Sequence, residues 1–419
     1  MKFGLFYEHQ LPKPYDSDDW EPDQEHKLFQ NALDQLELAD QLGFDYVFEV
    51  EHHFLEEYAH STAPEVFLAA VSQRTKNIRL GHGIALMPPR YNHPARVAER
   101  IATLDLVSNG RVEFGTGESA SEMELGGFGV AREEKKLMWE EATRQCVRMM
   151  TETPYGGYEG AYFGMPSRNV IPKPLQKPHP PLWVASSRRE TTMVAARLGM
   201  GSLGFAFETP DEAQERVEQY FQLIREECTP IGVAINPALA VLSSLMCCPT
   251  DEEAMARGVE GTQFFSYSLA YYYSPMTGPN HQPGKMNIYR RFKDTPEEER
   301  MGMFGARGRG FGGFGGSGGG ADEEPEDEVQ RALWRAAKRG GCIGSPDFIR
   351  DTLLKYEAAH LDTMIFVAQS GARKHEDIME SLQLFGTQVL PEFKERHKQH
   401  QKWRAEQLQG VEYPINSSI

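Results

Sequence analysis

The sequence predicts a closed parallel (β/α)8 TIM barrel, because strand-like apolar runs alternate with amphipathic helical segments along most of the chain. We count eight strand candidates, the number that closes such a barrel rather than leaving an open sheet. With 419 residues, of which 40% are hydrophobic, the chain can bury a large core. We therefore expect a single α/β barrel domain over residues 1–419, with a long Gly-rich insertion before the last strand.

The strands are predicted at short apolar or β-branched runs bounded by turn residues. They lie at residues 3–7, within 44–54, and at 78–86, 112–115, 182–185, 202–205, 238–246 and 363–368. The helices are predicted from apolar residues at helical spacing, as in the stripe of Leu28, Ala32, Leu36 and Ala39. They lie at residues 25–42, 64–74, 94–107, 133–150, 188–198, 211–227, 346–359 and 376–393, and several end at Gly43, Asn109-Gly110 or Gly199.

Two stretches interrupt this alternation. Residues 154–181 are rich in Pro, Gly and Tyr, which predicts a hairpin and an extended connector lying across the barrel mouth. Residues 265–342 contain a Gly-rich core followed by the acidic run D-E-E-P-E-D-E, and their composition and length predict a mobile insertion or lid. The R-G-R-G-F-G-G-F part is also typical of RNA-binding segments, but two arginines followed by an acidic run make a poor phosphate track.

Composition excludes several classes of function. The net charge of −17 disfavours nucleic acid and anionic membranes as partners. No apolar run approaches the roughly 20 residues of a membrane span, and the N-terminus opens into a strand without a signal-peptide pattern. We therefore expect a cytoplasmic protein. The five cysteines are scattered without C-x-x-C spacing, so neither a disulfide framework nor a thiolate metal site is indicated.

The most informative feature is the end of the second strand. The run F-D-Y-V-F-E-V-E-H-H-F places Glu51, His52 and His53 where the chain leaves the core, and catalytic groups of barrels sit at such strand ends. Because side chains alternate along a strand, we expect one histidine to face the mouth and the other to turn away. Two partly exposed loop histidines are the alternative. A metal-dependent hydrolase using Glu49 and these groups would need ligands from other strands, and the first strand lacks H-x-H.

Several motifs, in order along nearly the whole chain, resemble the bacterial luciferase-like flavin monooxygenase family. They are E-H-H-F (51–54), N-H-P (92–94), G-T-G-E-S (115–119), E-L-G-G-F-G (124–129), P-K-P-x-Q-x-P-H-P-P-L-W (172–183) and L-P-E-F (390–393). The resemblance implies a (β/α)8 barrel that binds reduced FMN (FMNH2), or in one branch the deazaflavin F420, at its C-terminal mouth. It also implies a separate flavin reductase that supplies FMNH2, and a homodimer or homotetramer.

The same resemblance implies roles for particular residues. His52 matches the histidine beside the reactive edge of the flavin, and His53 matches its partner. Reduced flavin and O2 form a C4a-hydroperoxide that an imidazole can hydrogen-bond and supply with protons. Gly83 and Ile84 match the place where the family often has a non-proline cis peptide against the flavin ring; packing within the strand is the alternative reading of these residues.

The expected phosphate site follows the fifth strand. Ser186, Ser187, Arg188 and Arg189 would bring hydroxyls, guanidiniums and free helix N–H groups together, although an ordinary helix cap with two solvated arginines is the alternative. Two positions depart from the family. Glu118 stands where an arginine often helps to hold the phosphate, and Gly117 replaces the reactive cysteine of luciferases, so light emission is not implied.

The substrate is expected to be a small hydrophobic organic molecule. Aromatic residues expected near the mouth are Phe6, Tyr7, His9, Phe54, Tyr58, Phe128, Tyr162 and Tyr271 to Tyr273, and core packing is their alternative role. Hydroxylation, Baeyer-Villiger insertion and oxidative cleavage all remain open. Two further alternatives are an F420-dependent oxidoreductase that transfers hydride, and a non-catalytic flavin-binding barrel.

Overall fold

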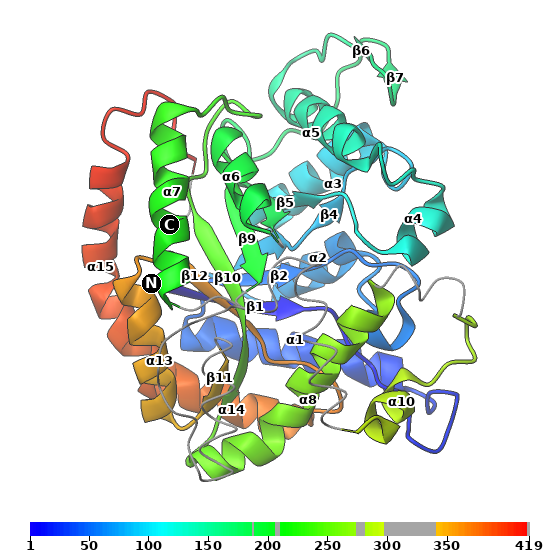
Figure 1. Cartoon of the computed structure of the whole chain (residues 1–419). Coiled ribbons are helices and arrows are strands. Elements are labelled where there is room, and N and C mark those ends of the chain that lie inside the picture. The colour runs from blue at the N-terminus through cyan, green and yellow to red at the C-terminus, as the bar shows by residue number, and fades with distance from the viewer. Residues whose placement is uncertain (187, 206–209, 274–280, 297–340, 417–419) are drawn as a thin grey trace.

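Eight parallel strands close into a barrel surrounded by helices, as the sequence predicts (Figure 1). The computed structural model describes residues 1–186, 188–205, 210–273, 281–296 and 341–416. The ring closes because β10 pairs with both β9 and β12, while β12 pairs with β1. The barrel strands are β1 (Lys2–Tyr7), β2 (Tyr46–Glu49), β3 (Arg79–His82), β5 (Val112–Gly117), β8 (Leu182–Ser186), β9 (Gly201–Phe205), β10 (Leu239–Cys247) and β12 (Thr363–Val367).

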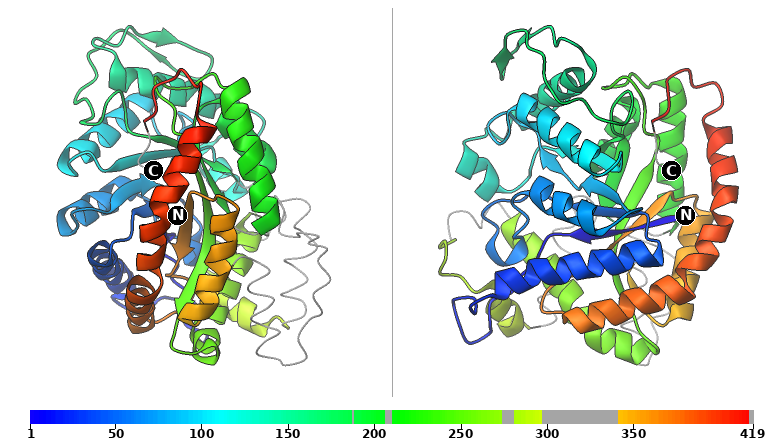
Figure 2. Two further views of the ribbon diagram at one scale, coloured as in Figure 1. Left: turned by 90° about the vertical axis from the view of Figure 1, so that its left-hand side faces the viewer. Right: turned by 180° about the vertical axis from the view of Figure 1, so that it is seen from behind.

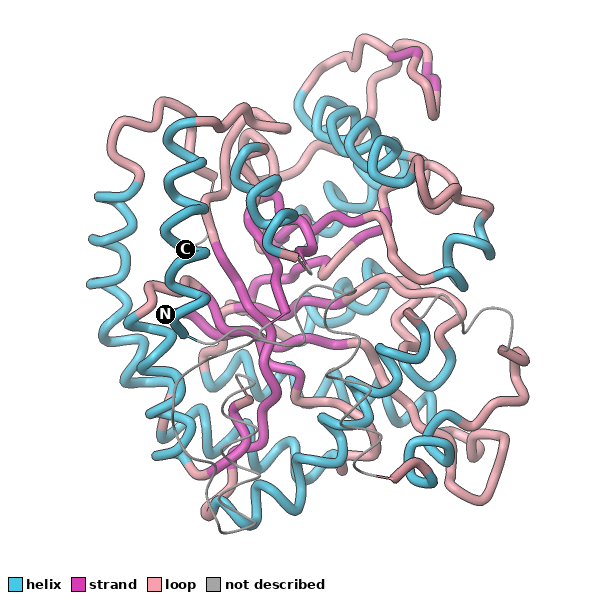
Figure 3. The backbone as a smooth tube through the Cα atoms, in the orientation of Figure 1, coloured by secondary structure: helices cyan, strands magenta, loops and turns pink. Residues whose placement is uncertain are grey.

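The helices form an outer layer around the strands, which gather at the centre in Figure 3. They are α1 (Gln24–Leu42), α2 (Pro64–Arg74), α3 (Pro94–Val107), α5 (Lys135–Thr151), α6 (Arg189–Arg197), α7 (Pro210–Glu226), α13 (Pro346–Ala358), α14 (His375–Gln388) and α15 (Leu390–Gln407). Among the described helices, none combines the length and apolarity that crossing a membrane requires. The predicted last helix, 376–393, is in fact two helices that meet at Val389. Pro391 lies in the first turn of α15, where a missing N–H costs nothing.

Side chains alternate between the barrel interior and the outer layer. Tyr46, Phe48 and Val50 pack inside the barrel with Trp183, whereas Val47 packs outward against the helices. Towards the N-terminal end of the barrel, the Trp183 indole donates a hydrogen bond of 2.6 Å to Glu113, which also pairs with Arg79. This alternation sends even-numbered residues after Tyr46 inward, so it also decides which way the polar residues beyond β2 face.

The third strand is shorter than predicted. The expected run 78–86 divides into β3 and β4 (Ala85–Leu86), and the interruption falls at Gly83 and Ile84. A Cβ on Gly83 would lie 2.9 Å from the Phe48 Cβ, so a side chain at this position would collide with the barrel interior. The glycine therefore serves close packing at the point where the chain bends.

Helix α8 (Asp251–Tyr272) was not predicted, and it crosses the C-terminal mouth of the barrel. Ser268 accepts a hydrogen bond from Gln10 in the loop after β1, and the Tyr272 carbonyl accepts one from Ser121 after β5. Two glycines within the helix weaken its sequence signal, but a Cβ on Gly258 would lie 2.6 Å from Met246. The close approach to β10 explains why that glycine is present.

The predicted insertion over 265–342 therefore begins inside an ordered helix. It also contains α10 (Ile288–Asp294) and ends in β11 (Cys342–Gly344), which pairs with β10. Its Gly-rich core and acidic run fall within residues 297–340, outside the described residues, so the expected lid stays a prediction.

The prediction that the connector over 154–181 crosses the barrel mouth is wrong. β6 (Tyr158–Glu159) and β7 (Gly164–Met165) do form a hairpin, but it packs on α5, where Glu141 accepts the backbone N–H groups of Ala161 and Tyr162. Gln176 then donates to the Val112 carbonyl at the start of β5. The hairpin projects outside the ring of strands in both views of Figure 2, and the connector after it returns to the start of β5, because a segment between a helix and the next strand runs back to the N-terminal end of the barrel.

Candidate active site

His52 lies at the C-terminal end of the barrel, between β2 and the short helix η1 (Glu56–Tyr58), and both of its ring nitrogens have polar partners. Nδ1 is 2.9 Å from Oε1 of Glu124 in α4 (Glu122–Phe128). Nε2 is 3.2 Å from the Tyr273 hydroxyl and 3.5 Å from Oε2 of Glu8. The ring thus joins the segments that follow β1, β2, β5 and β10, which meet only at the mouth.

Glu124 holds more than the imidazole. Its Oε1 also accepts the backbone N–H of His53 at 2.9 Å, and its Oε2 accepts the Ser119 hydroxyl. One fully buried carboxylate therefore fixes the backbone of the histidine loop and the orientation of the His52 ring. Such a partner determines which nitrogen points to the reacting groups.

His52, Glu8, Glu124, Tyr58 and Tyr273 form a cluster at the mouth. The pKa values of its histidine and its two carboxyl groups follow from burial and from the short distances between them. Burial alone would lower the pKa of His52, but the carboxylates of Glu124 and Glu8 outweigh it and raise the pKa to about 9. Burial raises the pKa of Glu8 to about 7, against the opposing effects of His52 and Tyr58. Burial would also raise the pKa of Glu124, yet His52 and Ser119 hold it below the usual value. At neutral pH the site therefore contains an imidazolium and an ionised Glu124.

Aromatic rings enclose this charged group. Tyr58 donates a hydrogen bond of 2.8 Å to Glu8, and its ring centroid lies 5.8 Å from that of His52. The Tyr273 ring lies 6.1 Å from His52, nearly perpendicular to it. Phe265 packs on Tyr58 from α8. A proton on His52 is therefore shielded from bulk water.

The two histidines face different surroundings, as the alternation of side chains predicts. His53 Nε2 lies 3.3 Å from Glu51, and its ring packs 4.9 Å from Phe128, outside the cluster around His52. Phe54 is half exposed beside it. His53 is thus attached to the wall of the site, and it contacts Glu124 only through its backbone.

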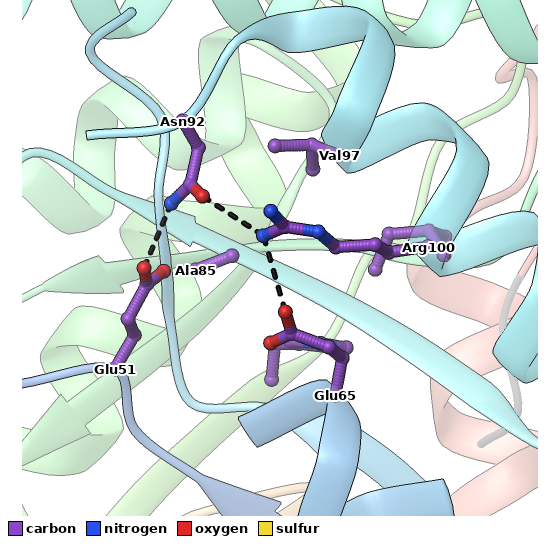
Figure 4. A pocket seen from close by; sticks show the side chains of 8 residues that line it. Glu51, Glu65, Ala85, Asn92, Val97 and Arg100 are labelled. Atoms are coloured by element: carbon purple, nitrogen blue, oxygen red, sulfur yellow. Dashed lines mark hydrogen bonds and ion pairs between the residues drawn. The ribbon is translucent and has the colours of Figure 1, made fainter. Parts of the chain in front are cut away.

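Both carboxylate oxygens of Glu51 accept hydrogen bonds from residues that follow β3. Figure 4 shows the adjoining pocket, where Glu51 accepts the Asn92 amide at 2.7 Å and Asn92 accepts Arg100 at 2.9 Å. The other Glu51 oxygen accepts the Leu86 N–H at 2.7 Å. The cavity of about 10 Å³ has room for about one water molecule. This pocket is too small for a substrate.

The structure differs from expectation at the third strand. The bond between Gly83 and Ile84 is trans, not cis, since the cis bonds of the described chain all precede proline. Ile84 instead packs over Gly117, where an added Cβ would lie 2.5 Å from the Ile84 side chain. These three residues form a tight apolar contact between neighbouring strands.

Glu118 is neutralised by a residue that the sequence did not single out. Lys135, at the start of α5, lies 2.7 Å from Glu118 and donates to the Ser119 carbonyl at 2.7 Å. The position where the family often has an arginine thus carries an ion pair, in which Lys135 cancels the negative charge of Glu118 near the end of β5.

The four residues expected at the phosphate site do not converge. The buried Ser186 hydroxyl is hydrogen-bonded to Ser202, and Arg189 points along α7, where it pairs with Glu215 at 3.5 Å. Arg188 is exposed and caps the N-terminus of α6, and Ser187 lies outside the described residues. Of the four, Arg188 keeps the position that an anion site at this helix end requires.

A second buried histidine–carboxyl pair lies on the outer face of the barrel. His9 Nε2 is 3.1 Å from Glu49, and its ring packs against Phe29 and Phe67 of α1 and α2. Burial lowers the pKa of His9 to about 3 and raises that of Glu49, so the pair is neutral. His9 therefore does not line the mouth, contrary to expectation.

Tyr7 also lies elsewhere, since its hydroxyl bonds to Gln35 of α1. Phe6 packs in the same apolar cluster as Tyr58, and Tyr162, in the hairpin on α5, packs near Phe128. Tyr58 and Tyr273 do reach His52. Within the described residues, no group of three or more histidine, cysteine or acidic side chains is placed to hold a metal ion.

Three residues with a part in the site were missed from the sequence. Glu124 lies in a quoted motif without an assigned role, and Glu8 follows β1 just as His52 follows β2, so strand-end position was the available signal. Lys135 comes from α5, and nothing in its local sequence indicates that it reaches the end of β5.

A closed parallel barrel with a buried histidine–carboxylate cluster at its C-terminal mouth has the arrangement in which barrel enzymes place their catalytic groups. The chain belongs to the luciferase-like monooxygenase family, whose model matches residues 1–363. This family is one of flavin-dependent oxidoreductases, and it includes F420-dependent relatives.

The curated relatives match parts of the chain. An uncharacterized protein of Sinorhizobium fredii is 35% identical over 41% of this chain and 49% of its own length. The oxygenase component of the flavin-dependent trigonelline monooxygenase of Acinetobacter baylyi is 26% identical over 59% of this chain and 67% of its own. The F420-dependent glucose-6-phosphate dehydrogenase of Microbacterium testaceum is 28% identical over 44% and 55%. The chain thus spans about half to two thirds of these relatives.

Two solved structures have the same fold over nearly the whole chain. Monooxygenase RslO1 of Streptomyces bottropensis superposes with a TM-score of 0.70 at 22% identity, covering 94% of this chain and 100% of its own. The oxygenating constituent of the 3,6-diketocamphane monooxygenase of Pseudomonas putida, in complex with FMN, has a TM-score of 0.65 at 20% identity, with 93% and 98% covered. At this identity the likeness concerns the fold.

Proposed function

We propose that the protein is a monooxygenase that uses reduced FMN and O2 to oxygenate a small hydrophobic organic substrate. The observation that carries the proposal is the position of His52 at the barrel mouth, where Glu124 holds its ring and aromatic rings enclose it. Family membership supplies the flavin chemistry, and the cluster supplies the proton that an oxygen-transfer reaction consumes.

The residues fit reduced FMN in part. An exposed Arg188 at the N-terminus of α6 would hold the phosphate, helped by the partial positive charge of that helix end. Ser186 would contribute little because its buried hydroxyl bonds within the barrel to Ser202, and Arg189 would contribute little because its side chain lies against α7, where it pairs with Glu215. The Tyr273 hydroxyl lies at the position beside Nε2 that a reacting oxygen would take, so Tyr273 must yield that position when the site is loaded.

The chain's own residues manage protons and water. Reduced FMN, when bound, supplies the two electrons that O2 needs, and one oxygen atom enters the substrate while the other leaves as water. His52 donates its Nε2 proton to the departing oxygen, since that nitrogen faces the mouth. Glu124 keeps Nδ1 hydrogen-bonded and the ring oriented throughout. Tyr58 and Phe265 exclude bulk water from this transfer.

We also propose a separate reductase that delivers the reduced FMN, and assembly as a homodimer or homotetramer. The reductase is supported by one relative being the oxygenase component of a monooxygenase. The choice between hydroxylation, Baeyer-Villiger insertion and oxidative cleavage stays open.

A second candidate is hydride transfer with F420 on the same barrel. It is favoured by the F420-dependent relative and by Glu118, which stands where an arginine was expected to help hold the FMN phosphate. Lys135 compensates the charge of Glu118, and this weakens the second argument.

Anaerobic titration separates the candidates. We expect reduced FMN to bind more tightly than oxidised FMN or reduced F420, because a diffusing reduced flavin must be captured. Fluorescence and absorbance titrations with the three cofactors measure this. Exclusive binding of F420 would favour the second candidate, and binding of none of them would refute both.

A further inference from the structure

Glu8 has an unusual position for an acidic residue. It follows β1 and is 1% exposed, and its Oε1 accepts the Tyr58 hydroxyl at 2.8 Å. Its Oε2 has no hydrogen-bond partner among the described residues and lies 3.5 Å from Nε2 of His52. A buried carboxyl oxygen without a donor is costly if the group is ionised, so Glu8 must either carry a proton or face a cation.

The groups around Glu8 keep these two states close in free energy. His52 favours the ionised form through its positive charge, and Tyr58 favours it by donating a hydrogen bond. Burial and the carboxylate of Glu124 favour the protonated form. Tyr273 also faces this space, Tyr91 acts on Tyr273, and Glu51 adds to the negative charge that acts on His52. The carboxylates of Glu8 and Glu124 therefore share the single positive charge of His52, which can fully balance only one negative charge.

We propose that Glu8 is the second proton-holding group of this site, which exchanges a proton with Nε2 of His52 and so sets the charge of the imidazole. When His52 has given its proton away, the O–H bond of Glu8 breaks and an N–H bond forms on Nε2. Glu8 becomes a carboxylate and His52 a cation again, while Glu124 remains ionised. No electrons move, and no other reactant is needed.

The separation of 3.5 Å is longer than a good hydrogen bond, but a side-chain shift of about 0.5 Å, ordinary for thermal motion, closes it. Catalytic hydrogen bonds are often longer before the site is loaded. In this role Glu8 is a positioning residue: it holds a proton for Nε2 of His52 and acts only through that ring. The use of this proton exchange during turnover rests on the proposed function. The exchange itself is expected in the protein without a bound cofactor.

The histidine–carboxyl pair of His9 and Glu49 provides a matched control. Glu49 is equally buried and lies 3.1 Å from His9, but it faces the outer layer, and both partners are neutral. Glu49→Gln therefore removes a buried carboxyl of the same kind without touching the cluster around His52.

The test is an NMR titration of the full-length protein with isotope-labelled histidine and no flavin, with His52 assigned by its loss in His52→Gln. We expect the wild-type His52 signals to show a main transition near pH 9 and a smaller one near pH 7. Glu8→Gln should abolish the smaller transition and lower the pKa of His52 by about one unit or more. Glu49→Gln should change neither.

An unchanged His52 titration in Glu8→Gln would overturn the proposal. If Glu8→Gln fails to fold, Tyr58→Phe gives a second test, because loss of the hydroxyl donor should move the smaller transition to higher pH. A transition that stays in place would again overturn the proposal. Since no cofactor is present, a protein that fails to bind reduced FMN would refute the proposed function and leave this result intact.

Discussion

Nδ1 of His52 lies 2.9 Å from Oε1 of Glu124, and the same oxygen accepts the backbone N–H of His53. One carboxylate thus orients the ring and fixes the loop that carries it. Because Nδ1 is occupied, only Nε2 can exchange a proton at the mouth. This relationship explains why adjacent histidines have different surroundings and why the pKa of His52 is raised despite burial.

The stability of the protein should fall at alkaline pH because of His52. Its pKa is raised from 6.5 to about 9, so its stabilising contribution is complete below 6.5 and is lost as the pH rises through about 9. The raised pKa of Glu8 acts in a lower pH window. Between pH 4.5 and about 7, Glu8 is ionised in the unfolded chain but protonated in the folded protein, so the free energy of unfolding falls as the pH rises. Urea unfolding of wild type and His52→Gln across both windows measures this. Equal losses in the two proteins above neutral pH would contradict the assignment.

Arg188→Ala should weaken binding of reduced FMN by about tenfold or more, the scale of losing a charge-assisted hydrogen bond. Arg189→Ala is the matched control and should have little effect, because Arg189 pairs with Glu215 and Gln219 on the surface. Anaerobic fluorescence titration measures both. A larger loss of affinity in Arg189→Ala than in Arg188→Ala would contradict this assignment and would place the phosphate beside Arg189.

Glu113→Ala should cost about 3–5 kcal/mol of unfolding free energy, because it removes the buried carboxylate that neutralises the partly buried Arg79 and leaves the buried Trp183 indole without its acceptor. Denaturant unfolding followed by tryptophan fluorescence reports the change. Glu99→Ala, which removes a surface partner of Arg96, is the control and should cost less than about 1 kcal/mol. Similar costs for the two variants would show that the buried pair is not structurally important.

The fold could be predicted because the alternation of helices and strands leaves a periodic signal. α2 and α3 begin and end where proline and the apolar pattern place them. α8 was missed because Gly258 and Gly261 weaken its local signal, although Thr250 caps its first turn. The tertiary contacts that compensate for the glycines cannot be read from the local sequence.

The site was predicted only where strand position decides it. His52 and His53 follow β2, and the alternation of side chains separates them as expected. The phosphate residues were predicted from adjacency in sequence, but Ser186 and Arg189 face different neighbours. Partners from distant elements, such as Glu124 and Lys135, depend on how the loops cross the mouth, and no spacing rule fixes that.

The most direct test of the central claim is rapid mixing of the reduced-FMN-loaded protein with oxygenated buffer, for wild type and His52→Ala. We expect His52→Ala to keep its fold and bind reduced FMN, but to reoxidise the flavin faster and with a higher yield of hydrogen peroxide, because the variant lacks the Nε2 hydrogen bond that would hold reduced oxygen in the enclosed site. His53→Ala is the control and should change the rate less, because its ring lies outside the cluster. Reoxidation at the same rate, with the same peroxide yield, in wild type and His52→Ala would contradict the claim.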